Sequence, residues 1–310
     1  MGFETLHNEN QFFKRNRVAV AGRTVEFLAN DKRLPEPQLK NDELPAIPQE
    51  MYLVGGNYGL WTPEQALKRV WYDASDTTTI TASGNDVSQI ADLSGFDAHS
   101  ISQVSPKTGT RTIGGLNVLD FDYGDWMSCT SNFSTPDSGE MMVFMVAQPD
   151  ARSRELFQDS LFALKKSTDN AVWIGIFPYS TTEFNGLTVF RSSDGIWGDP
   201  YQNPPHNGPS IYGFDKRPTG GFVSYVDGTD VYPDMGLDEW VEQSLDIIWL
   251  GRSPYLQVTY MDFAMGEFLV VPKVDLNTRQ KIEGYLAWKW GLVANLPASH
   301  PYKLKPPYLT

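Results

Sequence analysis

Short apolar runs separated by residues that favour turns make up most of the chain after residue 70. Runs of this kind, rich in β-branched and aromatic residues, predict β-strands rather than helices. We interpret the following segments as strands: residues 141–148, 172–177, 187–191, 222–226, 246–251 and 266–271. Many strands with few helices are typical of an all-β protein, and we predict a two-sheet antiparallel jelly-roll sandwich.

Two dipeptides between apolar runs predict hairpin turns. Asn185-Gly186 and Asp227-Gly228 belong to the residue pairs that tolerate positive φ at both central positions of a tight turn. We therefore expect each to join two neighbouring antiparallel strands.

Helical signals occur at two places only. Thr62 is a good N-cap, Pro63 suits the first helical position, and Gln65 completes a capping box, which predicts a short helix ending near Val70.

The second helical signal lies near the C-terminus. Asn277 is the expected cap, with Gln280 three residues later, and Gly291 is the expected stop. Apolar side chains share one face of this helix, namely Ile282, Tyr285, Leu286 and Trp290. Gly284 within it costs about 1 kcal/mol relative to Ala, which is tolerable if the backbone packs closely on a sheet.

Residues 1–59 form a zone unlike the rest, and we assign the sandwich domain to residues 60–310. Residues 34–50 are a proline-spaced polar linker. One interpretation is an irregular arm lying on the main domain. The other is an arm that becomes ordered on a partner, with "VAVAG" or "VEFLA" adding a strand.

The charge and composition exclude several function classes. The formal net charge of −13 disfavours binding to nucleic acid and to anionic lipid surfaces. Cys129 is the only cysteine, so the sequence predicts neither a disulfide framework nor a thiolate metal cluster. Because no apolar run is long enough to span a bilayer and the N-terminus lacks a signal-peptide core, we expect no membrane insertion and folding in a cytoplasm.

Catalytic motifs are missing from the sequence. The histidines are scattered and lack metal-ligand spacing: His7, His99, His206 and His300. No nucleophile elbow or phosphate-binding loop occurs. A glycosidase would need two carboxyl groups on one face, and no strand offers them at alternating positions. We therefore predict that the chain is not an enzyme and has no cofactor.

The acidic loops suggest calcium as a possible bound ion. Oxygen-rich loops contain the candidate ligands Asp73, Asp76, Asp92 and Asp97. Calcium takes six to eight oxygen ligands, which such loops can supply. The alternative is that these residues serve turns and helix caps, where Asp is common.

A long loop carries the candidate carbohydrate contacts. Residues 192–213 are rich in Gly and Pro and contain Trp197, Tyr201, Asn203 and Asn207. Exposed aromatic rings beside amide groups are typical of sugar binding, and recognition tends to lie on long ordered loops. The alternative is a loop folded on its own aromatic residues.

Two segments carry a resemblance to a known family. Trp71, Asp73 to Asp76, Thr79-Ile80 and the turn from Asp92 to Gly95 resemble the entry of concanavalin A-like lectin/glucanase domains of the laminin-G type in bacteriophage virion proteins. Residues 116–122 look like the strand that follows. The ending "RQKIEGYLAWKWGL…LPASHPYK…PP" is similar to the C-terminal helix and tail of those domains. The resemblance covers about residues 60 to 308.

The resemblance implies a sandwich displayed on a virion surface, as a capsid decoration or part of a tail fibre. It brings no catalytic residues, because the E-x-D-x-x-E motif of the glucanase branch is absent. In a virion protein, residues 1–59 would anchor the domain, with Lys14, Arg15 and Arg17 facing an acidic capsid or tail subunit. The resemblance also implies a homo-oligomer, with a trimer as the expected state. The alternatives are a receptor-binding lectin for host glycan and, less favoured, a glycan hydrolase.

Overall fold

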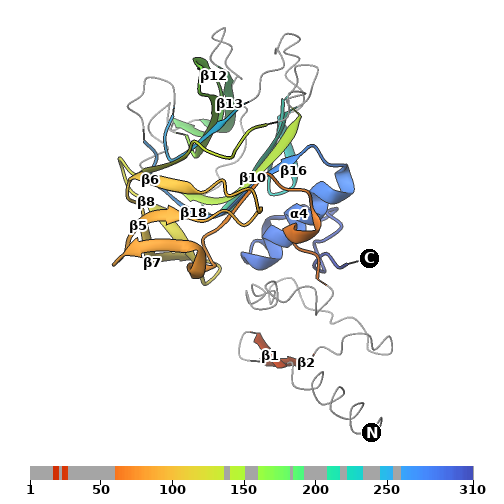
Figure 1. The fold of residues 1–310 in the computed structure, drawn as a ribbon. Coiled ribbons are helices and arrows are strands. Elements are labelled where there is room, and N and C mark those ends of the chain that lie inside the picture. Colours follow the sequence, from red (N-terminus) through yellow and green to blue (C-terminus); the bar gives the residue numbers. More distant parts are fainter. Residues whose placement is uncertain are drawn as a thin grey trace, which may run out of the picture.

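The computed structural model describes side chains and backbone for residues 60–135, 140–150, 160–168, 208–216, 223–230, 245–253 and 260–309. For the strand residues 17–20, 23–26, 169–181, 184–191, 222, 231 and 232 it describes the backbone alone. The trace of the whole chain is shown in Figure 1.

The body of the protein is an antiparallel β-sandwich, as predicted. Its first layer consists of β4 (Ile80–Ser83), β5 (Asp86–Ile90), β6 (Ser100–Val104), β9 (Trp126–Cys129), β17 (Ile247–Leu250), β11 (Phe162–Lys166), β12 (Asp169–Thr181) and β13 (Phe184–Arg191). Its second layer consists of β7 (Lys107–Ile113), β8 (Leu116–Phe121), β3 (Val70–Asp73), β18 (Phe263–Pro272), β10 (Met141–Pro149), β14 (Ser210–Lys216), β15 (Phe222–Val226) and β16 (Thr229–Tyr232). The pairing of β5 with β7 connects the two layers.

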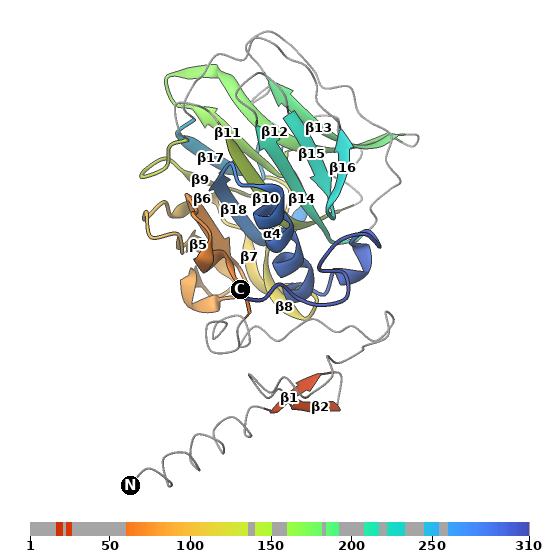
Figure 2. The same ribbon diagram turned by 90° about the vertical axis from the view of Figure 1, so that its right-hand side faces the viewer.

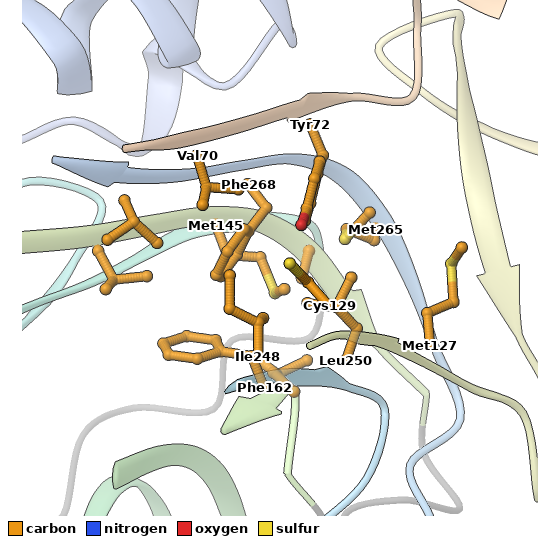
Figure 3. Close-up of a cluster of buried hydrophobic side chains, with 14 of the residues drawn as sticks. Val70, Tyr72, Met127, Cys129, Met145, Phe162, Ile248, Leu250, Met265 and Phe268 are labelled. Atoms are coloured by element: carbon orange, nitrogen blue, oxygen red, sulfur yellow. The ribbon is translucent and has the colours of Figure 1, made fainter. Parts of the chain in front are cut away.

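The main core fills the space between the layers. Phe162 of the first layer stacks on Phe214 and meets Phe268 edge-on, with ring centroids 5.9 and 5.3 Å apart. Figure 3 shows side chains of both layers converging in this core, among them Tyr72 and Ile248. Each fully buried side chain of this size contributes about 1.5–3 kcal/mol to folding, so the cluster is the main stabilising element.

A second core lies between the second layer and helix α4 (Leu276–Lys289). Figure 2 shows α4 lying across β10, β14 and β18. The predicted apolar face is buried, and every residue from Ile282 to Trp290 is buried as well. Among the described residues no helix is long and apolar enough to cross a membrane.

The C-terminal tail explains why α4 is buried on both sides. The indole of Trp288 donates a hydrogen bond of 2.8 Å to the carbonyl of Tyr302. A Cβ atom on Gly284 would lie 2.7 Å from Cβ of Tyr302. The backbone at Gly284 therefore packs closely on the tail.

The predicted N-cap of α4 is wrong. The cap is Asp275, whose carboxylate accepts a 2.7 Å hydrogen bond from the backbone N–H of Thr278. Asn277 lies inside the helix, since the helix begins two residues earlier than the sequence suggested. The predicted stop is confirmed, because Gly291 follows the last helical turn with φ +70°.

The first predicted helix is a single 3₁₀ turn, Pro63–Gln65. Its capping box is confirmed, with the backbone N–H of Thr62 donating to Gln65 over 2.6 Å. It ends well before Val70 because residues 70–73 pair with β18 as strand β3. Pairing of this β-branched and aromatic segment with the sheet replaces further helix.

Of the two predicted hairpin turns, one is confirmed. Asp227 and Gly228 join β15 to β16 with φ of +51° and +77°. Asn185 and Gly186 instead lie within β13, and the β12–β13 register closes at Thr181 and Phe184. That prediction is wrong because the strand begins before the dipeptide.

Near the N-terminus, β1 (Arg17–Val20) and β2 (Arg23–Glu26) pair with each other as an antiparallel hairpin. The two apolar pieces of this zone thus have partners within the chain. Arg17 begins β1, whereas Lys14 and Arg15 lie outside the described residues.

Candidate functional site: an aromatic cluster on the outer face

Two tryptophans lie on the outer face of the first layer, opposite its core side. Along β9 and β17 the side chains alternate, so that Met127, Ile248 and Leu250 enter the core. Trp126 directly precedes Met127, and Trp249 lies between Ile248 and Leu250. Both tryptophans are half-buried and belong to neither core. Their ring centroids are 5.5 Å apart at an interplanar angle of 68°.

Two cations lie over these rings. The guanidinium carbon of Arg252 is 4.3 Å from the ring centroid of Trp126 and 4.7 Å from that of Trp249. The ammonium nitrogen of Lys165 is 4.5 Å from the ring centroid of Trp249. Cation–π contacts at these distances are attractive and restrain the long side chains.

Two tyrosines extend the aromatic surface. Tyr260 forms a backbone bridge with Arg252. The guanidinium carbon of Arg252 lies 5.9 Å from the ring centroid of Tyr260. Tyr123 meets Tyr260 edge-on with ring centroids 6.0 Å apart, and it is 51% exposed. We call this set the outer-face cluster; it consists of Tyr123, Trp126, Lys165, Trp249, Arg252 and Tyr260.

A glycine sets the position of Arg252. Gly251 directly after β17 has φ +77°, a conformation that favours glycine, and a Cβ atom there would lie 2.9 Å from the carbonyl oxygen of Asp125. The chain can thus turn closely against the start of β9, which brings Arg252 over Trp126.

Burial lowers the pKa of Lys165 below its usual value, and the positive charge of Arg252 lowers it further, while Asp246 acts in the opposite direction. Burial raises the pKa of Asp125, next to Trp126, above its usual range. In the cluster, two cationic side chains thus lie over the indole rings. An aromatic surface of this kind suits contact with a ligand.

The sequence analysis did not identify this cluster. The available signal was a tryptophan alternating with core residues in each of two short strands, "WMSC" and "IIWL". That β9 and β17 are neighbours depends on a pairing between residues about 120 positions apart. The sequence pattern contains no information on that pairing.

The predicted carbohydrate-binding residues Trp197, Tyr201, Asn203 and Asn207 lie outside the described residues. Their role stays a prediction.

The four predicted calcium ligands have separate structural roles. Asp73 accepts a hydrogen bond from the backbone N–H of Ser75 and forms an ion pair with Lys289. Asp76 caps the 3₁₀ turn Thr77–Thr79. Asp92 accepts from the backbone N–H groups of Trp71 and Ala98, and Asp97 occupies a turn with φ +56°. Within the described ranges no three acidic, His or Cys side chains form a group that could hold a metal. The calcium prediction rests on the sequence pattern alone.

Two carboxylates that do lie together are buried beneath α4. Lys289 binds Asp73 over 2.5 Å and Glu267 over 2.7 Å. Glu267 also accepts hydrogen bonds from the indoles of Trp71 and Trp290 and from the hydroxyl of Tyr285, over 2.7, 2.9 and 3.0 Å. Burial raises the pKa of Glu267, and Lys289 opposes this effect. This network connects the helix to the sheet and is closed to substrate.

Comparison with known proteins shows a shared fold. The chain is similar to a GH54 α-L-arabinofuranosidase soaked with a cyclic sulfate inhibitor, with a TM-score of 0.53 and 8% identity over 73% of this chain and 60% of that one. It is also similar to an arabinofuranosidase complexed with arabinofuranosyl-α-1,2-xylobiose, with a TM-score of 0.52 and 8% identity over 75% and 60% of the two chains. The chain thus spans three fifths of the length of these enzymes. No protein-family model and no curated protein matches its sequence. The likeness establishes the fold, a β-sandwich shared with these arabinofuranosidases.

Proposed function

We propose that the chain is a non-catalytic, carbohydrate-binding β-sandwich whose outer-face cluster contacts glycan. The observation that carries the proposal is the position of Trp126 and Trp249, which lie together on the outer face although two apolar cores are available to them. Sugar rings present apolar C–H faces and polar edges. A surface that presents aromatic rings complements the apolar faces.

The fold supports this proposal in general terms. One of the similar arabinofuranosidases was solved with an arabinose-containing oligosaccharide, so a related sandwich occurs in a protein that binds sugar. The resemblance of the C-terminal segment to lectin-like domains points to the same class of ligand.

A glycan hydrolase is the second candidate, because the similar structures are glycosidases. Hydrolysis needs an accessible acid and a second carboxylate, separated by about 5–10 Å across the scissile bond. Asp73 and Glu267 are close together but buried and bound by the same lysine. We therefore favour binding. Release of reducing ends from a bacterial surface polysaccharide would overturn this choice.

We further propose that the domain is displayed on a bacteriophage virion, with residues 1–59 anchoring it to a capsid or tail subunit and a trimer as its assembly state. The support is the resemblance of the C-terminal helix and tail. Antibody against residues 60–310 should label intact particles, over the head for a decoration or at the tail tip for an adsorption protein. Particles without label would contradict the virion location.

Binding of the full chain to immobilised bacterial surface polysaccharides tests the glycan proposal. Tyr123→Ala and Trp249→Ala should each weaken binding about tenfold or more, as expected for loss of an aromatic contact at a binding surface. Phe96→Ala is the matched control, since Phe96 is 43% exposed and lies under Arg69 outside the cluster. Tyr123 is exposed, so its variant should stay folded even if the Trp249 variant does not. The proposal would be contradicted if the Tyr123 variant bound as well as the wild type and the Trp249 variant, shown to be folded, also bound.

A further inference from the structure

We infer that copies of this chain bind one another through a surface formed by Arg69, Phe96 and Asp97, with Arg69 of one copy paired to Asp97 of the next. We call these three residues the Arg69 patch. The inference rests on the trimer named in the proposed function, and it assigns the surface that holds the copies together.

Arg69 carries a charge that the described part of the chain leaves without a partner. Its guanidinium carbon lies 5.3 Å from the ring centroid of Phe96, and within the described residues its side chain forms no hydrogen bond or ion pair. Nε is buried, whereas Nη1 and Nη2 keep contact with solvent. By contrast, Arg111 and Arg279 each contact two carboxylates. The end of the Arg69 guanidinium is therefore open to a carboxylate from outside the chain.

Asp97 supplies the opposite charge in the same patch. Asp97 is exposed, and within the described ranges its carboxylate has no hydrogen bond or ion pair, not even with Arg69 of its own chain. Phe96, directly before it, is 43% exposed. The patch thus presents a cation, an apolar ring and an anion. Because it is complementary to itself, a second copy offers a carboxylate to Arg69 and a guanidinium to Asp97.

Hydrogen bonds hold the patch in place before a second copy arrives. The carboxylate of Asp92 accepts from the backbone N–H groups of Trp71 and Ala98 over 2.9 and 3.1 Å. The hydroxyl of Ser94 donates to the carbonyl of Arg69 over 3.1 Å. The turn that carries Phe96 is thereby joined to the start of β3. Since the turn is already ordered, little conformational entropy is lost on association.

The overall charge favours a contact of this kind between copies. The net charge of −13 makes two copies repel each other at long range, so an attractive contact needs opposite charges that meet locally. Arginine and aromatic side chains are enriched at the centres of protein interfaces. Another protein would need both charges in a matching arrangement, and a second copy carries them already. Around a three-fold axis, every Arg69 faces Asp97 of the next copy and the Phe96 rings meet at the centre.

Sedimentation of the full chain over a range of concentrations tests the inference. Arg69→Glu should weaken association about tenfold or more, because it places two carboxylates opposite each other. Lys281→Glu is the matched control, with the same change of charge on α4 outside the patch, and should associate as the wild type does. Association of the wild type should weaken as salt is raised.

Two further variants keep the test independent of the fold of Arg69→Glu. Asp97→Asn removes the anion, and Asn tolerates the φ of +56° at this position, so the variant should fold and associate more weakly. Combining Arg69→Glu with Asp97→Arg exchanges the two charges and should recover most of the association that either reversal loses. Glycan affinity per binding site should be the same in all variants, because the patch lies outside the outer-face cluster.

The outcomes separate this inference from the proposed function. Association that persists in both Arg69→Glu and Asp97→Asn would overturn the inference and leave the trimer standing. A wild-type mass of two copies, with association lost in these variants, would support the patch and overturn the trimer. A wild type that stays monomeric at every concentration would overturn both, and glycan binding by that monomer would leave the carbohydrate proposal intact.

Discussion

The ammonium group of Lys289 lies 2.7 Å from a carboxylate oxygen of Glu267, and both side chains are buried between α4 and β18. Burial alone would lower the pKa of Lys289, but Asp73 and Glu267 raise it, so the lysine is held in its charged form. The C-terminal helix therefore joins the sandwich through a hydrogen-bonded charge network as well as through apolar packing.

Lys289→Met should destabilise the fold by about 3–5 kcal/mol, because it leaves two buried carboxylates without their cation. Urea unfolding measures the change. Lys281→Met, on the same helix but only partly buried, is the control and should change stability by no more than about 0.5 kcal/mol. Equal stability of the two variants would show that the network does not hold the helix.

Asp227 makes stability depend on pH. Burial raises its pKa to about 6 from 3.8. Since the folded-state value is the higher one, the proton on Asp227 stabilises the fold at low pH, and this stabilisation is lost as pH rises from about 4 through 6. Asp227→Asn should remove this loss and stabilise the protein at pH 7 by up to about 3 kcal/mol.

The amide can still accept the hydrogen bond from the N–H of Ile211, and Asn tolerates the φ of +51° at this position. Asp230→Asn in the same hairpin is the control, because its side chain is 58% exposed and it should leave the pH profile unchanged. Melting temperatures between pH 4 and 8 give the comparison. Parallel profiles for the wild type and the Asp227 variant would refute this assignment.

Gly284→Ala should lower stability although alanine favours helix by about 1 kcal/mol. The added Cβ would lie 2.7 Å from Cβ of Tyr302 and 2.9 Å from Cγ of its ring, so the tail must move. Proteolysis after residue 296 should become faster. Asn277→Ala in the exposed first turn of α4 should be neutral or slightly stabilising, because Asp275 and not Asn277 caps the helix. A melting temperature that is higher for Gly284→Ala than for Asn277→Ala would contradict this description.

The loop predicted from the sequence offers a competing glycan site. If the outer-face cluster is the binding surface, Trp197→Ala and Tyr201→Ala should bind glycan as well as the wild type does, whereas Trp249→Ala should not. The opposite pattern would confirm the sequence-based site. Glycan binding measured on all three variants decides between them.

Deletion of residues 1–50 tests the proposed anchor. The truncated chain should be missing from assembled particles while its sandwich still folds, as judged by an unchanged melting temperature. Normal incorporation of the truncated chain would refute the anchoring role.

Local patterns were sufficient to predict the sandwich and the C-terminal helix. Short apolar runs between turn residues predicted segments such as β10 and β18, and Gly291 correctly predicted the helix stop. Burial on all sides of the second half of α4 was not predictable, because it depends on a tail that folds back on Gly284.

The outer-face cluster was not predictable for a related reason. Trp126 and Trp249 come together only through the pairing of β9 with β17, and Arg252 joins them through the turn at Gly251. In the sequence, each tryptophan is an ordinary apolar residue within a short strand. Long-range register, rather than local propensity, determines which of them reaches the surface.

Hydrogen–deuterium exchange of the full chain, with and without a bound polysaccharide, tests the central claim most directly. The account predicts that the backbone amides of residues 123–126 and 249–252 become protected when the polysaccharide binds, while α4 is unchanged. Protection confined to other parts of the chain, with these two segments unaffected, would contradict the assignment of the outer-face cluster as the glycan site.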